Sequence, residues 1–267
     1  MKRNGFTLVE LLVTVAIIAV LGSLATVGYQ SVRENARMTR EVNAARNLIA
    51  GYLLHASDHN GQVLPGYRAD PSATNLDGRP LPFPTNARYP WRLTPYIPKI
   101  EGVMLFNGNE SALDSHNRDY LVSVRPNLGI NATLVGGHHG SGSPLPPNDR
   151  VIDELGNFHL TRLPQASRPE LLIVFASARS DSQHNPTGYY EVRPPNLLSP
   201  VWSSTTFSPD QPASAHGFVD FRWKNRAVAA TLAGNVELLD EAEMRDMRRW
   251  SIQAADANAP DFRITRQ

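Results

Sequence analysis

The chain has 267 residues, enough for one medium-sized domain and an accessory element. Its 26 basic and 25 acidic residues give a formal net charge of +1, so composition offers no electrostatic basis for general nucleic-acid binding. The absence of cysteine excludes disulfides, thiolate metal sites, thiol catalysis and a lipid anchor on cysteine.

The first feature in chain order is an apolar segment behind a short basic start. Between Phe6 and Val27 the only charged residue is Glu10. This stretch of about 22 residues would form roughly 33 Å of helix, enough to cross the hydrocarbon core of a bilayer once. Lys2 and Arg3 precede it, so the positive-inside rule predicts a cytoplasmic start and an exported remainder.

Glu10 is the unusual residue of this segment. A carboxylate near the centre of a bilayer costs about 2.5–3.5 kcal/mol, so we expect it to have a partner. Cleavage between Gly5 and Phe6 would create an α-amino group one helical turn before Glu10. In a staggered assembly, the amine of one copy would meet the carboxylate of the next. Each charge would offset the burial cost of the other, and the pair would fix the axial register.

The run over residues 2–13 resembles the type III signal of type IV prepilins and type II secretion pseudopilins. In that family a membrane-embedded prepilin peptidase cuts after the glycine and methylates the new N-terminal phenylalanine. By position, the resemblance makes Gly5 the residue before the cut, Phe6 the methylated residue and Glu10 the glutamate used in assembly.

The same resemblance implies a location and a set of partners. The chain would cross the inner membrane once, with a cytoplasmic N-terminus and a periplasmic head, and its filament would lie in the periplasm or at the cell surface. The implied partners are prepilin peptidase, copies of the chain and other pseudopilins, and the inner-membrane assembly platform. No cofactor and no nucleic acid are expected.

Two simpler interpretations of the N-terminus compete with this one. A secretory signal peptide would share the basic start and the apolar run, and Ser23-Leu24-Ala25 is an acceptable cleavage site. Glu10 inside the apolar region argues against it. A plain signal anchor would need neither the Gly5-Phe6 pair nor Glu10.

An amphipathic pattern continues the apolar segment. The first proline is Pro65, so no proline interrupts a helix before it. From residue 29 to 57 most apolar positions are three or four apart, which indicates one buried face. They are Tyr29, Val32, Ala36, Val42, Ala45, Ile49, Tyr52 and Leu53, and the opposite side holds Arg33, Glu34, Arg37, Arg40, Glu41 and Arg46. We therefore predict a leader over 1–5 and a helix over 6–57, with a transmembrane half (6–27) and an amphipathic stalk (28–57).

Residues 58–267 are predicted to form one globular head. Residues 60–98 predict a long loop, pinned by aromatic side chains between 89 and 97. Short apolar runs predict strands at 120–124, 171–176, 189–193, 217–223, 227–232 and 236–239. Gly234-Asn235 favours a hairpin between the last two. Asp240 and Glu243 form a candidate capping box for a helix over 241–250, before a frayed polar tail after Ser251.

The predicted fold class is therefore α+β and pilin-like: a long N-terminal helix packed on a C-terminal antiparallel sheet with long loops. The segments 127–131 and 168–176 also resemble a large-headed, pseudopilin G-like group. Its members often end in a hairpin with Asp and His, where this chain has Ala233 and Asn235. No role that depends on that Asp or His carries over.

Within the head, the glycine-rich stretch 136–143 is the strongest candidate for a ligand-binding site. His138 and His139 could hold Zn²⁺ with help from His159 or His184. Adjacent histidines point apart on an extended backbone, however, so the prediction is a mobile, solvated glycine loop without a metal.

His55 and His59 have i,i+4 spacing at the end of the predicted helix, where they would cap its carboxyl end. Asp77, Asp149 and Asp153 are acidic positions expected in loops, and some type II pseudopilins bind Ca²⁺ through such oxygens. None has EF-hand spacing, so turn chemistry is predicted for them. The default for Trp202, Trp223 and Trp250 is core or hairpin packing rather than a surface site.

The predicted function is that of a structural subunit of a type II secretion pseudopilus or a type IV pilus-like filament. The alternative is a membrane-anchored periplasmic enzyme or ligand-binding domain, which would need a polar cleft around the histidines of the head. No Gly-x-Ser-x-Gly, P-loop or dinucleotide fingerprint is present in the sequence, and no enzymatic activity is predicted.

Overall fold

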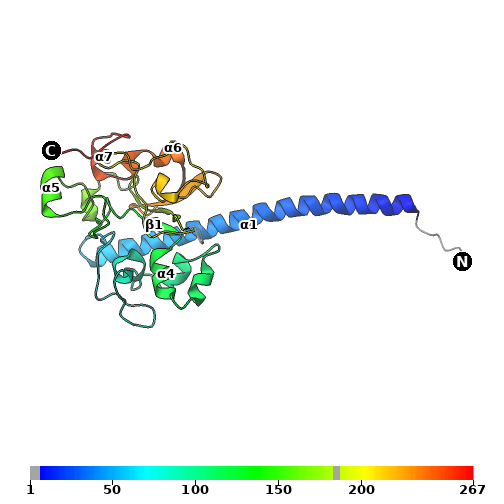
Figure 1. The fold of residues 1–267 in the computed structure, drawn as a ribbon, viewed down its shortest axis with the longest axis horizontal. Helices are drawn as coiled ribbons and strands as arrows, with labels where there is room; N and C mark the ends of the chain where they lie inside the picture. Colours follow the sequence, from blue (N-terminus) through cyan, green and yellow to red (C-terminus); the bar gives the residue numbers. More distant parts are fainter. Residues whose placement is uncertain (1–6, 183–186, 267) are drawn as a thin grey trace. The chain divides into compact units, whose positions relative to one another are not determined.

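The computed structural model describes residues 7–182 and 187–266, except the side chains at positions 22 and 24–28 (Figure 1). The leader, the Gly5–Phe6 bond and His184 lie outside the described residues. The chain divides into two compact units, Met1–Arg40 and Glu41–Gln267, called here the N-terminal unit and the head unit. The division falls within the helix α1, Leu8–Asp58.

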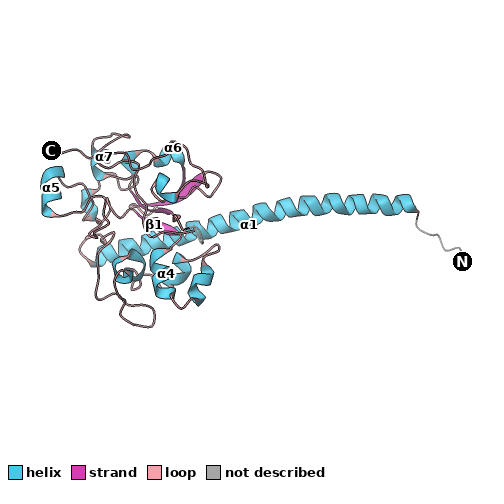
Figure 2. Cartoon of the chain, viewed as in Figure 1, coloured by secondary structure: helices cyan, strands magenta, loops and turns pink. Residues whose placement is uncertain are grey.

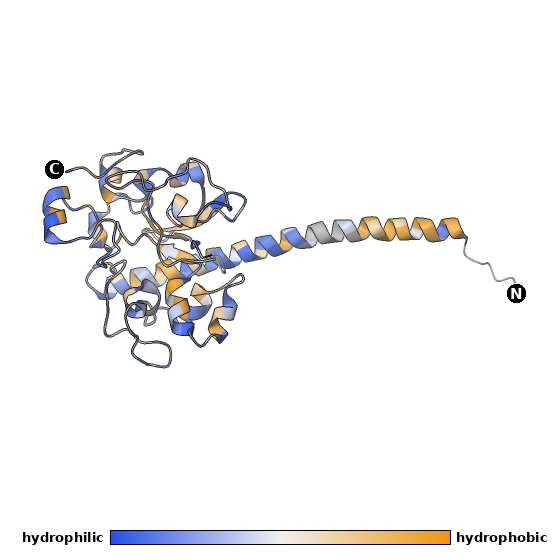
Figure 3. Ribbon diagram, in the orientation of Figure 1, coloured by the Kyte–Doolittle hydropathy of each residue, from blue (hydrophilic) through white to orange (hydrophobic). Residues whose placement is uncertain are grey.

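In the N-terminal unit, α1 is an uninterrupted helix whose first turns are mostly apolar, with Glu10 and Thr14 among them (Figure 3). Ten large apolar side chains between residues 8 and 21 are each at least 48% exposed: Leu8, Val9, Leu11, Leu12, Val13, Val15, Ile17, Ile18, Val20 and Leu21. Such a surface on a single chain is typical of a segment that contacts lipid or another protein. Among the described residues, no helix is both long enough and apolar enough to traverse a membrane.

In the head unit, α1 lies against a four-stranded antiparallel sheet of order β1-β2-β3-β4. The strands are β1 (Leu128–Ile130), β2 (Ile173–Ser177), β3 (Arg226–Thr231) and β4 (Val236–Asp240). The buried face of α1 follows a spacing of three and four and comprises Ala44, Ala45, Leu48, Ile49, Tyr52 and Ala56. The predicted α+β class, a helix followed by an antiparallel sheet, is confirmed.

The two faces of the sheet have different neighbours because side chains alternate along a strand. Phe175 in β2 faces α1, where its ring meets Tyr52 edge-on at 5.6 Å between centroids. Its neighbour Ala176 belongs instead to a hydrophobic cluster that includes Trp202 and Trp250. The central strands are therefore covered on both sides.

A buried carboxylate joins α1 to this sheet. Glu41 has no exposed surface, although the sequence pattern placed it on the charged face. The Ser177 hydroxyl donates to Glu41 Oε1 at 2.5 Å and accepts from the Val228 amide at 2.8 Å. Arg222 Nη1 lies 3.7 Å from Glu41 Oε2. Burial raises the pKa of the Glu41 carboxyl, and Arg222 and the Ser177 hydroxyl oppose this rise.

Two asparagines of the segment 127–131 hold loops onto the sheet. Asn131 Nδ2 donates to the carbonyls of Ile173 and Trp250, at 3.2 and 3.1 Å. Asn127 Oδ1 accepts from the Phe106 amide at 3.2 Å. Both residues are fully buried, so their amides replace water for backbone groups that the short strands leave unpaired.

The rest of the head unit consists of short helices joined by long loops (Figure 2). The α-helices are α2 (Tyr89–Arg92), α3 (Ile100–Met104), α4 (Arg118–Val124), α5 (Asp149–Leu155), α6 (Glu241–Met244) and α7 (Ile252–Asp256). Single 3₁₀ turns occur at Thr85–Ala87, Glu110–Asp114, Leu163–Gln165, Ala213–His216 and Met247–Arg249. As predicted, the loop over 60–98 is held by buried aromatic side chains, among them Tyr89 and Trp91.

Three of the predicted strands are wrong. Residues 120–124 lie in helix α4. Segments 189–193 and 217–223 are buried chain with isolated bridges only, Ile130 to Glu191 and Ala178 to Val219. A short apolar run indicates burial but does not distinguish strand, helix and buried loop. The predicted hairpin is confirmed as β3–β4, with Gly234 at φ 88° in the connection.

The C-terminal prediction also needs correction. The capping box of Asp240 and Glu243 is present, but α6 ends after one turn. The Asp246 carboxylate then accepts from the Arg248 amide and starts a separate 3₁₀ turn. The tail is packed rather than frayed, because Ile264 is 2% exposed and its amide donates to the Leu197 carbonyl.

Candidate assembly site at the start of α1

The start of α1 is closed by a reciprocal pair of side chains. The amide and hydroxyl of Thr7 donate to Glu10 Oε2 at 2.9 and 2.8 Å. The Glu10 amide in turn contacts Thr7 Oγ1 at 3.3 Å. This is a capping box, in which two amides of the first turn find side-chain acceptors. The sequence contains this signal as Thr-x-x-Glu, although the position of Glu10 in an apolar segment predicts only an amine partner.

The capping box uses only one oxygen of the carboxylate. Within the described residues, Glu10 Oε1 accepts no hydrogen bond, and the side chain is exposed. The carboxylate lies at the amino end of the helix, where the helix dipole favours negative charge. The Glu10 side chain therefore has a fixed orientation and a free acceptor oxygen at the amino end of α1.

The structure separates the two histidines of the glycine stretch, as predicted. His138 is 3% exposed, stacks on Tyr67 at 4.5 Å between ring centroids, and has Nε2 3.9 Å from Glu191 Oε2. His139 and His159 instead line a hollow near the end of α1. The prediction of a solvated loop is wrong for Gly136 and Gly137, which are buried, with φ near 77° and 79°.

The remaining candidate residues lie at a helix end, in a turn or within a helix. His59 Nδ1 contacts the His55 carbonyl at 2.8 Å, so His59 caps the carboxyl end of α1 as predicted. The Asp77 amide donates to Asn75 Oδ1 in a turn. Asp149 and Asp153 lie in helix α5 rather than in a loop. Across the described residues, no three His or acidic side chains are grouped so that they could hold a metal ion.

The three tryptophans considered for a surface site are buried. Trp202 is 5% exposed, Trp223 7% and Trp250 not at all. The indole nitrogens of Trp202 and Trp250 donate to the carbonyls of Arg193 and Met244, at 2.9 and 2.7 Å. Core packing is therefore their role.

The start of the chain is similar to a known family. Residues 1–26 match the family model described as the prokaryotic N-terminal methylation motif. This match supports the type IV prepilin and pseudopilin family. The motif implies processing by a prepilin peptidase and assembly into pilin filaments. No curated protein and no solved structure matches the chain.

Proposed function

We propose that the chain is a structural subunit of a type II secretion pseudopilus or a type IV pilus-like filament, cleaved after Gly5 and N-methylated at Phe6. The observation that carries this proposal is the placement of Glu10 within the methylation motif. Its carboxylate is fixed by Thr7 and has one free oxygen, at the amino end of a helix whose large apolar side chains over residues 8–21 are exposed.

Assembly follows from two kinds of interaction. Cleavage gives each subunit a positive amine at Phe6, and Glu10 Oε1 of a neighbouring subunit accepts from it. The exposed apolar side chains of residues 8–21 then pack between neighbouring helices. Because the lipid that these side chains leave is itself apolar, the gain comes from close van der Waals packing between helices and not from removal from water. Apolar packing supplies most of the free energy, and the ion pair selects one axial register because a shifted register leaves both charges unpaired.

The membrane anchor is part of the proposal. The predicted span over 6–27 includes Phe6 and the side chains at 22 and 24–27, which lie outside the described residues. In this account the span holds the subunit in the inner membrane before assembly, with the head in the periplasm. Loss of residues 1–5 removes Lys2 and Arg3 and changes the formal net charge from +1 to −1.

Within this family we favour a secretion-type subunit. The support is the resemblance of segments 127–131 and 168–176 to the large-headed, pseudopilin G-like group. Gene neighbourhood tests this choice. Secretion ATPase and secretin genes without retraction machinery are expected nearby, and a retraction ATPase gene beside pilus genes would contradict it.

Substitution of Glu10 tests the function. We expect Glu10→Gln and Glu10→Ala to insert in the membrane and be cleaved, but to yield at least tenfold less filament in a shearing or cross-linking assay. Thr14→Ala, which removes a hydroxyl bonded to the Leu11 carbonyl in the same helix, is the matched control and is expected to assemble normally.

Substitution of Thr7 distinguishes an intersubunit ion pair of Glu10 from a capping role of Glu10. Thr7→Ala breaks the capping box but keeps the carboxylate. We expect this variant to assemble, with a cost of about 1 kcal/mol or less to the first helical turn. If Thr7→Ala abolishes assembly as completely as Glu10→Gln, the glutamate acts as a cap and the intersubunit pair is wrong. Normal filaments from Glu10→Gln would contradict the proposal directly.

A further inference from the structure

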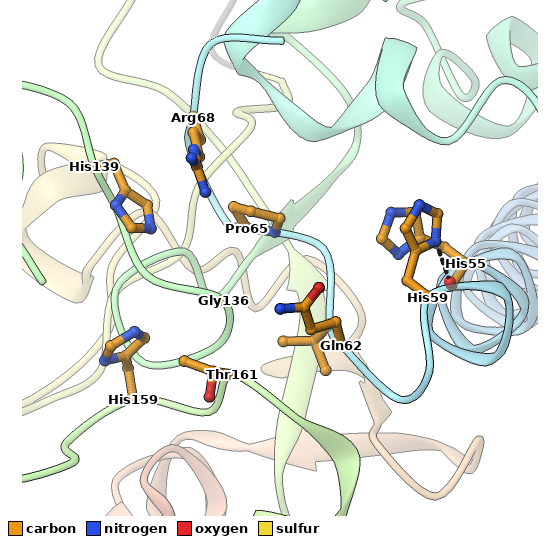
Figure 4. A pocket seen from close by; sticks show the side chains of 10 residues that line it. His55, His59, Gln62, Pro65, Arg68, Gly136, His139, His159 and Thr161 are labelled. Atoms are coloured by element: carbon orange, nitrogen blue, oxygen red, sulfur yellow. Dashed lines mark hydrogen bonds between the residues drawn. The ribbon is translucent and has the colours of Figure 1, made fainter.

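The head unit contains a hollow of about 260 Å³ between the end of α1 and the glycine turn at 136–139 (Figure 4). Its polar side chains include four histidines and an arginine: His55, His59, Arg68, His139 and His159. They come from three separate stretches of the chain, the end of α1, the segment 62–68 and the region 136–161. Sequence spacing alone did not indicate that these imidazoles share one space.

The walls of the hollow are fixed by backbone hydrogen bonds. The Val63 amide donates to the Thr161 carbonyl at 3.0 Å, and the Gly136 amide to the Leu160 carbonyl at 2.8 Å. The His139 amide donates to the Tyr67 carbonyl at 2.8 Å. A side chain at Gly136 would collide with the backbone of residues 64–66, so the turn depends on glycine. The shape of the hollow is therefore determined by the backbone of the fold.

The lining of the hollow contains one permanently charged side chain, the guanidinium of Arg68. Among the described residues, no carboxylate lines the hollow. A second hollow, of about 480 Å³, shares His55 and His59 and adds Arg92 and Asp70. Arg92 is 7% exposed, and within residues 7–182 and 187–266 its guanidinium donates only to carbonyl oxygens, those of Arg88, Pro65 and Gly66. Asp70 offsets part of the charge of Arg92, whereas Arg68 faces no carboxylate in the lining of the first hollow and would attract an anion there.

Two of the imidazoles have unused hydrogen-bonding capacity. His55 is 9% exposed and His159 is 3% exposed, and both line the hollow. Nδ1 of each ring is buried and has no hydrogen-bond partner within the described residues. A buried polar atom left unpaired costs about 1–3 kcal/mol, which a ligand oxygen or a proton and its counter-ion would offset.

The charge state of these rings depends on what occupies the hollow. Burial lowers the pKa of His55 and of His159 to about 4, and also lowers the pKa of His139. The charged neighbours are His59, Arg92, Asp58 and Asp70 around His55; Arg68, His138 and Arg92 around His139; and His139 beside His159. An anion in the hollow would favour the imidazolium forms and raise these pKa values.

The ring geometry favours an anion over a metal ion. His55 and His59 stack almost in parallel, 4.1 Å between centroids with 13° between planes. The lone pairs of parallel rings lie side by side and do not converge on one cation. His59 Nδ1 is also engaged with the His55 carbonyl, which requires a proton on that nitrogen.

We propose that this hollow binds a small free oxyanion with a sulfate, phosphate or carboxylate group. Arg68 and His139 at the exposed rim donate to its oxygens, while His55 and His159 form the buried wall and are protonated as the anion binds. Binding at this site is separate from filament assembly, which uses the other unit of the chain.

The test is equilibrium dialysis of the full chain in non-ionic detergent against radiolabelled sulfate, at pH 6 and pH 8. Sulfate keeps its charge across this range, so any pH dependence belongs to the protein. We expect one saturable site per chain. Affinity should be about a hundredfold higher at pH 6 than at pH 8 for each proton taken up on binding throughout this range, because log K changes by the number of protons taken up for each pH unit.

Exposed rim residues allow substitutions that keep the fold. Arg68→Gln and His139→Gln should each weaken sulfate binding about tenfold, equivalent to about 1.4 kcal/mol. Arg79→Gln and His116→Gln replace exposed residues outside the hollow and should leave binding unchanged. Circular dichroism and tryptophan fluorescence confirm folding. Displacement by phosphate or by acetate supports the proposal and shows which oxyanion class binds more tightly.

Three results would overturn the proposal. The first is the absence of saturable sulfate binding at pH 6. The second is binding that Arg68→Gln and His139→Gln leave unchanged. The third is a chain that does not bind sulfate but binds Zn²⁺ stoichiometrically, with His139→Gln abolishing the Zn²⁺ binding. The site would then be a metal site.

Discussion

Glu10 in the N-terminal unit and Glu41 in the head unit both belong to α1, but their surroundings differ completely. Glu10 is exposed, and its partner is Thr7 in the same helical turn. Glu41 is fully buried, and its partners are Ser177 and Arg222, far away in the sequence. One helix therefore contains one acid that the fold buries, with its unbonded Oε2 facing Arg222 at 3.7 Å, and one whose unbonded oxygen is exposed.

The apolar side chains show the same contrast. Leu8 and Ile18 are 80% and 68% exposed, while Leu48 and Ile49 are at most 1% exposed. The more hydrophobic part of α1 is thus the part that has no partner within the described chain. The apolar side chains of residues 41–56 therefore stabilise the fold, whereas those of residues 8–21 are left exposed, as the proposed packing between subunits requires.

The largest expected effect comes from the buried part of the helix. Leu48→Ala should lower the free energy of unfolding of the head unit by about 2–5 kcal/mol, because the side chain is fully buried and leaves a cavity. Ile18→Ala, the matched exposed position, should change it by less than about 0.5 kcal/mol. Urea titration followed by tryptophan fluorescence measures both, since all four tryptophans lie in the head unit. Equal effects would remove the contrast between the two parts.

The buried acid should have the next largest effect. Glu41→Ala should cost about 3 kcal/mol, because it leaves Arg222 and the Ser177 hydroxyl without their partner. Arg222 retains Asp220 at 2.9 Å, which limits the loss. Glu34→Ala, in the N-terminal unit, should change the same free energy by less than about 0.5 kcal/mol. A neutral Glu41→Ala variant would show that the contact does not hold the helix on the sheet.

The pH dependence of stability sharpens the comparison. The pKa of Glu41 is raised by burial above its usual 4.5, so the folded head binds a proton that the unfolded chain has released. The contribution of Glu41 is then full below pH 4.5 and decreases as pH rises through the folded pKa. Subtracting the urea-derived stability profile of Glu41→Gln from that of the natural chain, between pH 4 and 8, should give a difference that falls with pH. A rising difference would mean that Arg222 outweighs burial.

The smallest effect concerns the two capping boxes. Asp240→Ala should lower the stability of the head unit by about 1 kcal/mol, because it removes the acceptor for the Glu243 amide in α6. Thr7→Ala removes the corresponding cap of α1 but should leave the head unit unchanged, since Thr7 belongs to the other unit. Matching losses in the two variants, by the same urea titration, would show that the units unfold together.

The sequence was sufficient for features that depend on local pattern. The end of α1 was placed within one residue, at Asp58, because no proline precedes it and a polar Gly-containing segment follows. The β3–β4 hairpin and the Asp240 capping box also follow from neighbouring residues. The methylation motif is local as well, and residues 1–26 match it.

Features that depend on distant contacts could not be predicted. The helical spacing of charged residues predicts that Glu41 lies on the exposed face of α1. The spacing cannot reveal its burial, because its partner Ser177 is 136 residues away. The tail was expected to fray because nothing nearby in the sequence indicates that Ile264 packs beneath the loop at Leu197. The hollow of four histidines gathers three separate stretches that share no motif.

The central claim is that cleavage creates the amine that Glu10 accepts in the filament. Intact mass and N-terminal sequencing of the protein purified from cells with an active prepilin peptidase test it most directly. The account predicts a chain that begins at Phe6 and carries one added methyl group on its amine. A chain that retains Met1 to Gly5 under those conditions would contradict it.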